Sequence, residues 1–425
     1  MHPISQSVVN FELAWCLFLV SFTAGNEKSE TSATFEEQVE SVDAWIQRGS
    51  PWKVDLKKDV PLILWWTGRL FTGFDDVKEV NCGDEAVCYS SANRSYGAVA
   101  RAFYFYGTDL DPEDLPLPRL PHHEWALIHE ESPMNNYILS HGPMIRQFNH
   151  TATFKRESDY PITTHSLPSL DYLLSRRPLS LERKNELRRA GLAPVLYVQS
   201  HCGIPSDRDR YVKELMKHVP VDSYGKCLNN RELPELMRDP VQSMFAEDFL
   251  QFIAQYKFHI AFENAICPDY VTEKLFRPLH VGSVPIYRGS SRVKDWLPDE
   301  HLGIVVDDFD SPQELAKFIN FLDANNSEYE RYLEFKELGV SNKFLLENMQ
   351  SREWGINDHE KPNMFSGFEC HICKKISKRH RLEKEHTTDS SVELLPRYHA
   401  TVSHMSCPQP YTSLGDPSDC EATDK

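Results

Sequence analysis

The sequence predicts an α/β protein made of two Rossmann-like domains that face each other across a cleft. Short apolar runs bounded by Gly, Pro and Asp recur in the first half, as expected for buried strands. In the second half such runs alternate with helical segments, a pattern typical of a parallel, doubly wound sheet. With 425 residues, the chain is long enough for two substantial cores.

The first domain is expected over residues 60–190. Its apolar runs lack alternation, which is typical of strands covered on both faces. A basic segment at 175–190 is helix-prone after its proline and is expected to connect the two domains. Strands are expected at 61–66 (PLILWW), 101–106 (RAFYFY) and 125–128 (WALI).

The second domain is expected over residues 191–373. The sequence contains no Walker-type glycine loop, so a nucleotide would have to bind at strand ends and helix starts. Residues 374–425 lack periodic apolar content and are expected to form an irregular tail. Strands are expected at 195–200, 221–225 and 258–262, and helices at 207–218, around 246–255 and from Thr272 onward.

The segment 257–278 is the most informative part of the chain. Its apolar strand ends in Glu263 and Asn264, at the edge where open parallel sheets bind ligands. The following helix begins near Glu273, and its free N–H groups suit a phosphate, with Lys274 as an additional cation. From spacing alone, the two glutamates are equally compatible with a sugar ligand and with ordinary helix capping.

Longer motifs distinguish these alternatives. The run KFHIAFENAICPDYVTEKLFRP at 257–278 is followed by SRVKDWLP at 291–298, IVVDDF at 304–309 and SPQELAKFINFLD at 311–323. Together these runs resemble the donor-binding region of the α1,3-fucosyltransferase family. The resemblance implies the GT-B fold, GDP-fucose as the donor and inversion of the anomeric centre. The second domain would then bind GDP-fucose, and the first would lie on the acceptor side.

The stretch HEESPMNNY at 129–137 resembles the family motif whose glutamate is the general base, which implies Glu131 as the catalytic residue. The chemistry needs such a group, because the acceptor hydroxyl must lose its proton as it attacks the anomeric carbon. Glu130 lies one position off the motif. Without the family match, a carboxylate capping a helix that begins near Pro133 is the favoured interpretation.

The resemblance also assigns the donor site. Arg208 lies eight residues after Ser200, which matches the spacing of the family's diphosphate-binding arginine. Glu273 is expected to stabilise positive charge on fucose. Where many relatives have tyrosine this chain has His259, which predicts an altered nucleotide contact. The implied donor-binding residues are Ser200, Arg208, Glu263, Asn264, Tyr270, Glu273 and Lys274.

No metal or other cofactor is expected, because the acidic pair Asp307 and Asp308 is interpreted as a loop cap. A net charge of -17 argues against a nucleic-acid partner. Ten cysteines and three N-glycosylation sequons fit an oxidising secretory compartment. The sequons lie at Asn93, Asn149 and Asn325.

The cysteines allow several pairings. Cys370 and Cys373 form a CxxC for which a redox or zinc role is possible, but the resemblance favours disulfides. With Cys82 and Cys88 they permit three pairings, either local or linking the two ends of the catalytic region. Cys202 and Cys227 follow neighbouring strands and are expected to bridge, whereas Cys267 is expected to be a free thiol.

Residues 1–25 contain a ten-residue apolar run at 13–22, which is short for a membrane span. A cleaved signal peptide and a weak type II membrane anchor are both compatible with it, as is a misassigned start. Residues 26–59 are polar and are expected to form a stem. The resemblance implies a luminal enzyme of the endoplasmic reticulum or Golgi.

The acceptor is implied by the resemblance alone. FYGTDL, DSYGKC, RDRYVKELM and GFECHIC are most similar to the branch of the family numbered ten and eleven, and more so to eleven. That branch implies transfer to Ser or Thr of EMI-domain proteins, with weak action on N-glycans. A mainly glycan-directed α1,3-fucosyltransferase and a catalytically silent, lectin-like folding factor are the alternatives.

Overall fold

The computed structural model describes residues 56–57, 59–67, 77–175, 179–204, 206–238, 246–299, 302–405 and 407. The expectations for residues 1–25 and for nearly all of the stem lie outside this part of the chain. Among the described residues, we find no helix with the length and apolar content that a membrane crossing requires.

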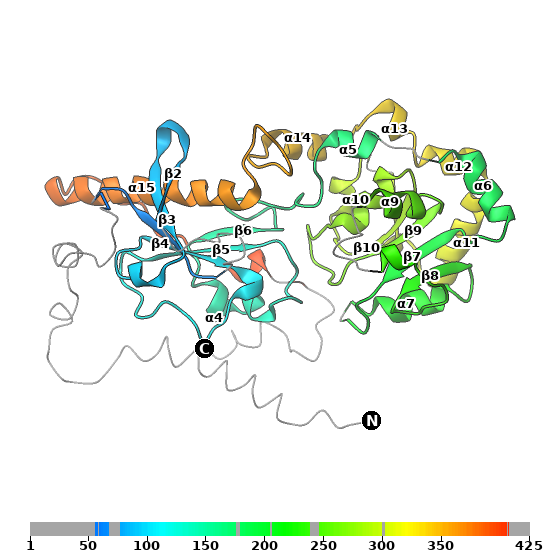
Figure 1. Cartoon of the computed structure of the whole chain (residues 1–425), viewed down its shortest axis with the longest axis horizontal. Coiled ribbons are helices and arrows are strands. Elements are labelled where there is room, and N and C mark those ends of the chain that lie inside the picture. Colours follow the sequence, from blue (N-terminus) through cyan, green and yellow to red (C-terminus); the bar gives the residue numbers. More distant parts are fainter. Residues whose placement is uncertain are drawn as a thin grey trace, which may run out of the picture.

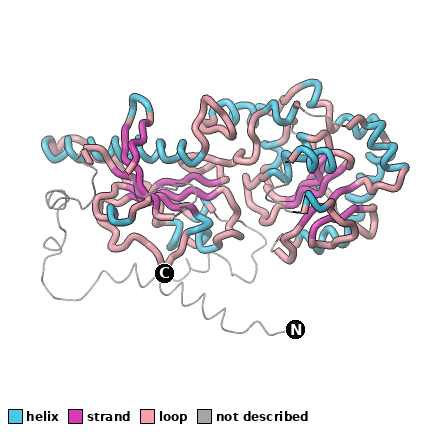
Figure 2. Tube along the Cα trace, viewed as in Figure 1, coloured by secondary structure: helices cyan, strands magenta, loops and turns pink. Residues whose placement is uncertain are grey.

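The predicted α/β class is confirmed: two separate sheets form two bodies that lie side by side (Figures 1 and 2). The first sheet has six strands in the order β2-β3-β1-β4-β5-β6, and all its neighbours are parallel except β2 and β3. Its strands are β1 (Leu62–Trp65), β2 (Lys78–Asn81), β3 (Val87–Ser91), β4 (Ala102–Tyr106), β5 (Glu124–His129) and β6 (His150–Thr153).

Strands β1, β4, β5 and β6 of this first sheet are buried along their whole length or nearly so. Apolar runs predicted the first three of these strands, whereas β6, with the sequence HTAT, was not predicted. Short helical turns connect them at the sheet edges. These turns are η2 (Gly83–Glu85), η3 (Arg94–Tyr96), η4 (Gly107–Asp109), η5 (Tyr137–Ser140) and α4 (Gly142–Ile145). A further turn, η9 (Val402–His404), comes from near the end of the described chain and contacts α4.

The second sheet is wholly parallel, in the order β11-β10-β9-β7-β8. Its strands are β7 (Val195–Gln199), β8 (Val221–Gly225), β9 (Phe258–Phe262), β10 (Val284–Arg288) and β11 (Ile304–Val305). The helices of this half are α5 (Leu170–Leu174), α6 (Leu181–Arg189), α7 (Arg208–Leu215), η6 (Glu235–Met237), α9 (Glu247–Ile253), α10 (Glu273–His280), η7 (Val293–Trp296), η8 (Val306–Asp308), α11 (Pro312–Ala324), α12 (Asn326–Arg331), α13 (Phe335–Leu338) and α14 (Lys343–Ser351).

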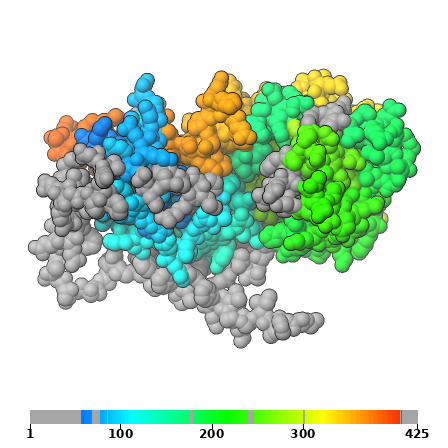
Figure 3. All heavy atoms as spheres, viewed as in Figure 1, coloured from blue at the N-terminus to red at the C-terminus, as the bar shows by residue number. Residues whose placement is uncertain are grey.

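Local sequence explains where several of these helices begin. The hydroxyl oxygens of Ser180, Thr272 and Ser311 accept hydrogen bonds from backbone N–H groups in the first turns of α6, α10 and α11. In the space-filling view, the region of α14 and the loop after it (orange) lies above the boundary between the two bodies (Figure 3).

The irregular tail predicted from residue 374 is wrong for its first part. Residues Met364–Thr388 form one helix of 25 residues, α15, which lies along the first sheet (Figure 1). Phe368, Ile372 and Ile376 are buried on one side of it, and the Trp65 indole donates to Glu369 Oε1 at 2.6 Å. The predicted boundary at residue 373 therefore cuts a helix that belongs to the first body. The buried apolar face of α15 is narrow, and basic residues flank it. The sequence therefore lacked a clear helical periodicity.

Four disulfides are present among the described residues. Cys82–Cys370 and Cys88–Cys373 join the two ends of the catalytic region, which selects the cross-linked pairing. Cys202–Cys227 is confirmed. The prediction that Cys267 is free is wrong, because it is bonded to Cys407. The chain returns to the donor loop only in three dimensions, so spacing could not reveal this partner.

The three sequons differ in accessibility. Asn93 and Asn325 are half-buried caps of short helices. Asn149 is 3% exposed, its Nδ2 donates to the Tyr398 carbonyl at 2.8 Å, and its Oδ1 accepts from the Trp125 backbone at 3.0 Å. The expectation of a glycan on Asn149 is therefore wrong for the folded protein, because the amide nitrogen is enclosed and already donates a hydrogen bond.

Candidate active site

The loop between β9 and α10 is held by a buried carboxylate. Glu263 is 1% exposed, and its two oxygens accept from the Thr272 backbone N–H at 2.9 Å and from the Thr272 hydroxyl at 2.8 Å. Burial raises the pKa of Glu263 to about 7, against the opposing effect of Lys274. Glu263 thus fixes the start of α10 relative to the strand end, and its direct contact with a donor stays a prediction.

Charged residues cluster on the first turn of α10. The Lys274 ammonium lies 3.2 Å from Glu273 Oε1 and 3.7 Å from Glu263 Oε2. Arg277 Nη2 lies 3.8 Å from Glu273 Oε1. Burial opposes ionisation of Glu273, but Lys274 and Arg277 lower its pKa to about 2. The helix start therefore carries an ionised carboxylate beside cations, next to N–H groups that suit a phosphate.

Arg208 lies beneath this loop. It is 2% exposed, and it donates to the Phe262 carbonyl at 3.1 Å and the His201 carbonyl at 2.8 Å. Its Nε is buried without a hydrogen-bond partner among the described residues. Ser200 is exposed at the end of β7 and precedes His201, whose carbonyl accepts from Arg208, so both predicted residues lie close to strand ends of the second sheet.

Two residues near Arg208 in sequence or on the neighbouring strand β9, Arg210 and His259, lie outside this cluster. Arg210, two positions along α7, is exposed and pairs with Asp207 on the surface. His259 faces away from the loop: it is 6% exposed, and its Nε2 lies 2.8 Å from the Ile253 carbonyl. The predicted change in a nucleotide contact at His259 is therefore not supported by its position.

Glu131 comes from the first body and contacts the donor loop of the second. The Tyr270 hydroxyl donates to Glu131 Oε2 at 2.9 Å. Beside it, the Ser132 hydroxyl lies 2.9 Å from Asn264 Oδ1. Among the described residues no helix begins at Pro133, so Glu131 is not a helix cap. The ends of β5 and β9, far apart in sequence, thus bring the expected base to the expected donor site.

Glu130 has a different environment. Its Oε1 accepts from the Tyr106 hydroxyl at 2.7 Å, within the first body. Adjacent carboxylates therefore point to different partners, one toward β4 and one toward the donor loop. This separation agrees with the motif position of Glu131.

A second contact between the bodies was missed by sequence reasoning. Asp269 is fully buried in a left-handed conformation, with φ +65°. Its carboxylate accepts from Arg156 Nη2 at 2.6 Å and from Arg292 Nη1 at 2.7 Å, and Arg156 also reaches Asp295. The turn at Pro268 and Asp269 was the available signal, but Arg156 and Arg292 lie 113 and 23 positions away from Asp269, so the sequence could not pair them.

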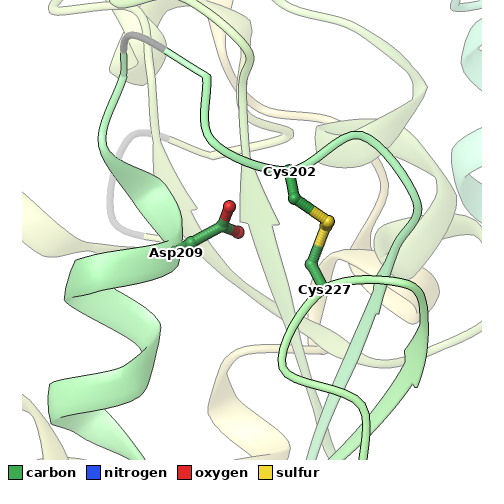
Figure 4. Close-up of side chains that lie close together, drawn as sticks. All are labelled: Cys202, Asp209 and Cys227. Atoms are coloured by element: carbon green, nitrogen blue, oxygen red, sulfur yellow. A yellow bond between two sulfur atoms is a disulfide. The ribbon is translucent and has the colours of Figure 1, made fainter. Parts of the chain in front are cut away.

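The part of the chain that the structure describes contains one group of three side chains close enough to hold a metal: Cys202, Asp209 and Cys227 (Figure 4). The two sulfurs are bonded to each other, so they do not offer thiolate ligands. Asp209 accepts from the Gly203 N–H at 2.7 Å and from the Tyr197 hydroxyl at 3.0 Å. This cluster is a structural cross-link beside α7.

Two α/β sheets whose strand ends meet around a carboxylate and a cationic helix start define a glycosyltransferase of the GT-B type. Residues 188–391 match the model of glycosyltransferase family 10 (fucosyltransferase), C-terminal part, and residues 58–164 match the fucosyltransferase N-terminal model. The chain belongs to this fucosyltransferase family.

Curated relatives carry the name GDP-fucose protein O-fucosyltransferase 3. The protein from Gallus gallus is 48% identical over 82% of this chain and 72% of its own length. The protein from Homo sapiens is 46% identical over 85% of this chain and 74% of its own. A solved α1,3-fucosyltransferase with GDP-fucose has 15% identity and a TM-score of 0.39, covering 79% of this chain and 96% of that structure.

Proposed function

We propose that this protein is an inverting fucosyltransferase that moves L-fucose from GDP-β-L-fucose to Ser or Thr hydroxyls of EMI-domain proteins. The observation that carries the proposal is the hydrogen bond between Tyr270 and Glu131, which joins the candidate base to the donor loop. The relatives' shared name, GDP-fucose protein O-fucosyltransferase 3, supports the donor and a protein acceptor.

In this mechanism Glu131 accepts the proton of the acceptor hydroxyl as that oxygen attacks the anomeric carbon. The bond from the anomeric carbon to the diphosphate oxygen breaks on the opposite face, and GDP leaves. In-line displacement turns the β-linked donor into an α-fucoside. The proton ends on Glu131, and the bonding electrons leave with GDP.

The donor-side residues stabilise the leaving group and the sugar. Arg208, Lys274 and the N–H groups of α10 lower the barrier by stabilising charge on the diphosphate, an effect often worth several kcal/mol. Glu273 stabilises positive charge on fucose. Ser200, Glu263, Asn264 and Tyr270 position the nucleotide sugar, directly or through the loop. The proposed steps need no metal ion, because these groups supply the positive charge.

We place the protein in the lumen of the secretory pathway, in the endoplasmic reticulum or Golgi. The four disulfides support this location, because such bonds form and persist in oxidising compartments. An N-terminal membrane anchor or a cleaved signal remains part of the proposal for residues 1–25.

The test is a transfer assay with the purified protein, GDP-fucose and either an EMI domain or an N-glycan. Wild type should fucosylate the EMI domain, and Glu131→Gln should reduce the rate by roughly 10³-fold. Glu130→Gln is the matched control and should retain most of the rate. Undiminished transfer by Glu131→Gln would rule out Glu131 as the general base. Transfer to the glycan alone would show that the acceptor is a glycan and not a protein hydroxyl. No transfer to either acceptor would favour the catalytically silent folding factor.

A further inference from the structure

A large groove lies on the first body, away from the donor loop. Its volume is about 1190 Å³. One wall is a stripe of α15 residues that runs from Gly367 to Arg381, with lining side chains three or four positions apart on one helix face. At 1.5 Å per residue this stripe is about 21 Å long. The opposite wall is formed by Asn81 at the end of β2 and Asp84 in the turn η2.

The groove is cationic although the chain as a whole carries a charge of -17. Four basic residues of α15 line it, against the carboxylates of Asp84 and Glu353. Two further basic residues of α15, Arg379 and Lys384, contact Glu124 and Asp59. The basic residues that line the groove are Lys374, Lys375, Lys378 and Arg381.

A disulfide joins two walls of the groove, and residues with polar atoms line it. The Cys82–Cys370 disulfide ties its two walls together. The lining residue Tyr160 is 4% exposed, and its hydroxyl has no hydrogen-bond partner among the described residues. The same holds for Nε2 of the lining residue His371. A Cβ on Gly367 would lie 2.1 Å from the Tyr160 hydroxyl, so glycine leaves the space for it.

The helix that lines the groove begins close to residues that contact Glu130, the neighbour of the candidate base. α15 begins in the middle of the molecule, near α14, and extends to the far side of the first body (Figure 1). Near its start, Phe365 packs against Tyr106 with ring centroids 6.1 Å apart, and Tyr106 donates to Glu130. A protein acceptor engaged at Glu131 therefore has the groove within its reach on the acceptor-side body.

We propose that this groove binds an acidic segment of the protein acceptor, apart from the residues around the acceptor hydroxyl. A stripe about 21 Å long suits a chain segment more than a single small anion, and the charge of the groove complements carboxylates. The fixed walls lower the ordering cost of binding. The inference rests on the proposed function for its assumption of a protein acceptor.

The test reverses three exposed charges in Lys375→Glu/Lys378→Glu/Arg381→Glu. We expect the KM for an EMI-domain acceptor to rise roughly tenfold at low salt, with kcat retained. The difference should shrink at high salt, because salt screens exposed charges. The KM for GDP-fucose should not change. A poly-glutamate peptide should compete with the protein acceptor for wild type and lose this effect with the variant.

The matched control is Lys213→Glu/Lys317→Glu/Arg331→Glu, three exposed residues on the donor-side body. An equal KM increase in this control, or no increase in the groove variant, overturns the proposal that the groove binds the acceptor. A lowered KM in the groove variant also overturns it, because the groove would then hold this chain's own acidic segment 27–43.

If wild type hydrolyses GDP-fucose but modifies no protein, the proposed acceptor is wrong. Direct binding of poly-glutamate to wild type and to the groove variant then tests whether the groove binds acidic segments. Equal affinity for the two proteins, or no binding to either, rejects the proposal.

Discussion

The donor-side and acceptor-side bodies encode their sites in different ways. On the donor side, the loop carboxylate, the helix cap and the charged helix start all lie within residues 263–277 and contact one another directly. On the acceptor side, Glu131 follows β5, but the sheet that carries it is covered by α15, more than 230 residues later. Local sequence therefore builds the candidate donor loop and the helix start after it, whereas long-range packing builds the acceptor side.

The two bodies meet in a loop that belongs to both. Ala265, Cys267 and Tyr270 follow β9 of the donor side, yet they are buried in a hydrophobic cluster of the acceptor side. The disulfide to Cys407 anchors the same loop. The candidate base and the donor loop therefore form one packed unit that depends on both bodies.

The largest expected effect concerns the link between the bodies. Cys267→Ser/Cys407→Ser should lower the free energy of unfolding by about 4 kcal/mol, measured by denaturant titration, because the cross-link spans 140 residues. Cys202→Ser/Cys227→Ser, which opens a span of 25 residues within the donor side, is the control. Its loss should be smaller by about 1.5 kcal/mol. An equal or larger loss in the control would contradict the special role of the loop.

The second prediction tests the electrostatics of the donor side. Because the pKa of Glu273 falls to about 2 on folding, its ionised form stabilises the protein above pH 4.5, and this contribution is lost as pH falls toward 2. Glu273→Gln should remove up to about 3 kcal/mol of this acid-dependent stability. The measurement is the free energy of unfolding against pH, with the exposed Glu182→Gln as control. Parallel curves of unfolding free energy against pH for wild type and Glu273→Gln would refute the stabilisation of ionised Glu273 by Lys274 and Arg277.

The third prediction concerns the acceptor side. Asn149→Gln should lower the free energy of unfolding by about 2 kcal/mol, because the longer side chain misplaces buried hydrogen bonds to Trp125 and Tyr398. It should leave the number of N-glycans on the secreted protein unchanged in mass spectrometry. Asn93→Gln, at a half-buried cap, is the comparison for stability. Loss of a glycan in Asn149→Gln would contradict the conclusion that the Asn149 amide is enclosed and carries no glycan.

The smallest predicted effect lies at the contact itself. Tyr270→Phe keeps the ring against Phe154, with centroids 5.1 Å apart, but removes the hydrogen bond to Glu131. We expect kcat to fall roughly tenfold, as for loss of one hydrogen bond to a charged group. The KM for GDP-fucose should stay constant in steady-state kinetics. A raised KM with constant kcat would instead assign the hydroxyl to the donor.

The sequence alone determined the α/β class, most strand positions and the donor motif. Those features depend on local patterns: unbroken apolar strands, a capped helix start at Thr272, and charges at fixed spacing. Only the tertiary structure decided that α15 covers the first sheet, that Cys267 pairs with Cys407, that Asn149 is enclosed and that Asp269 receives Arg156. Each of these joins residues more than 100 positions apart, whose contacts depend on how the whole chain packs.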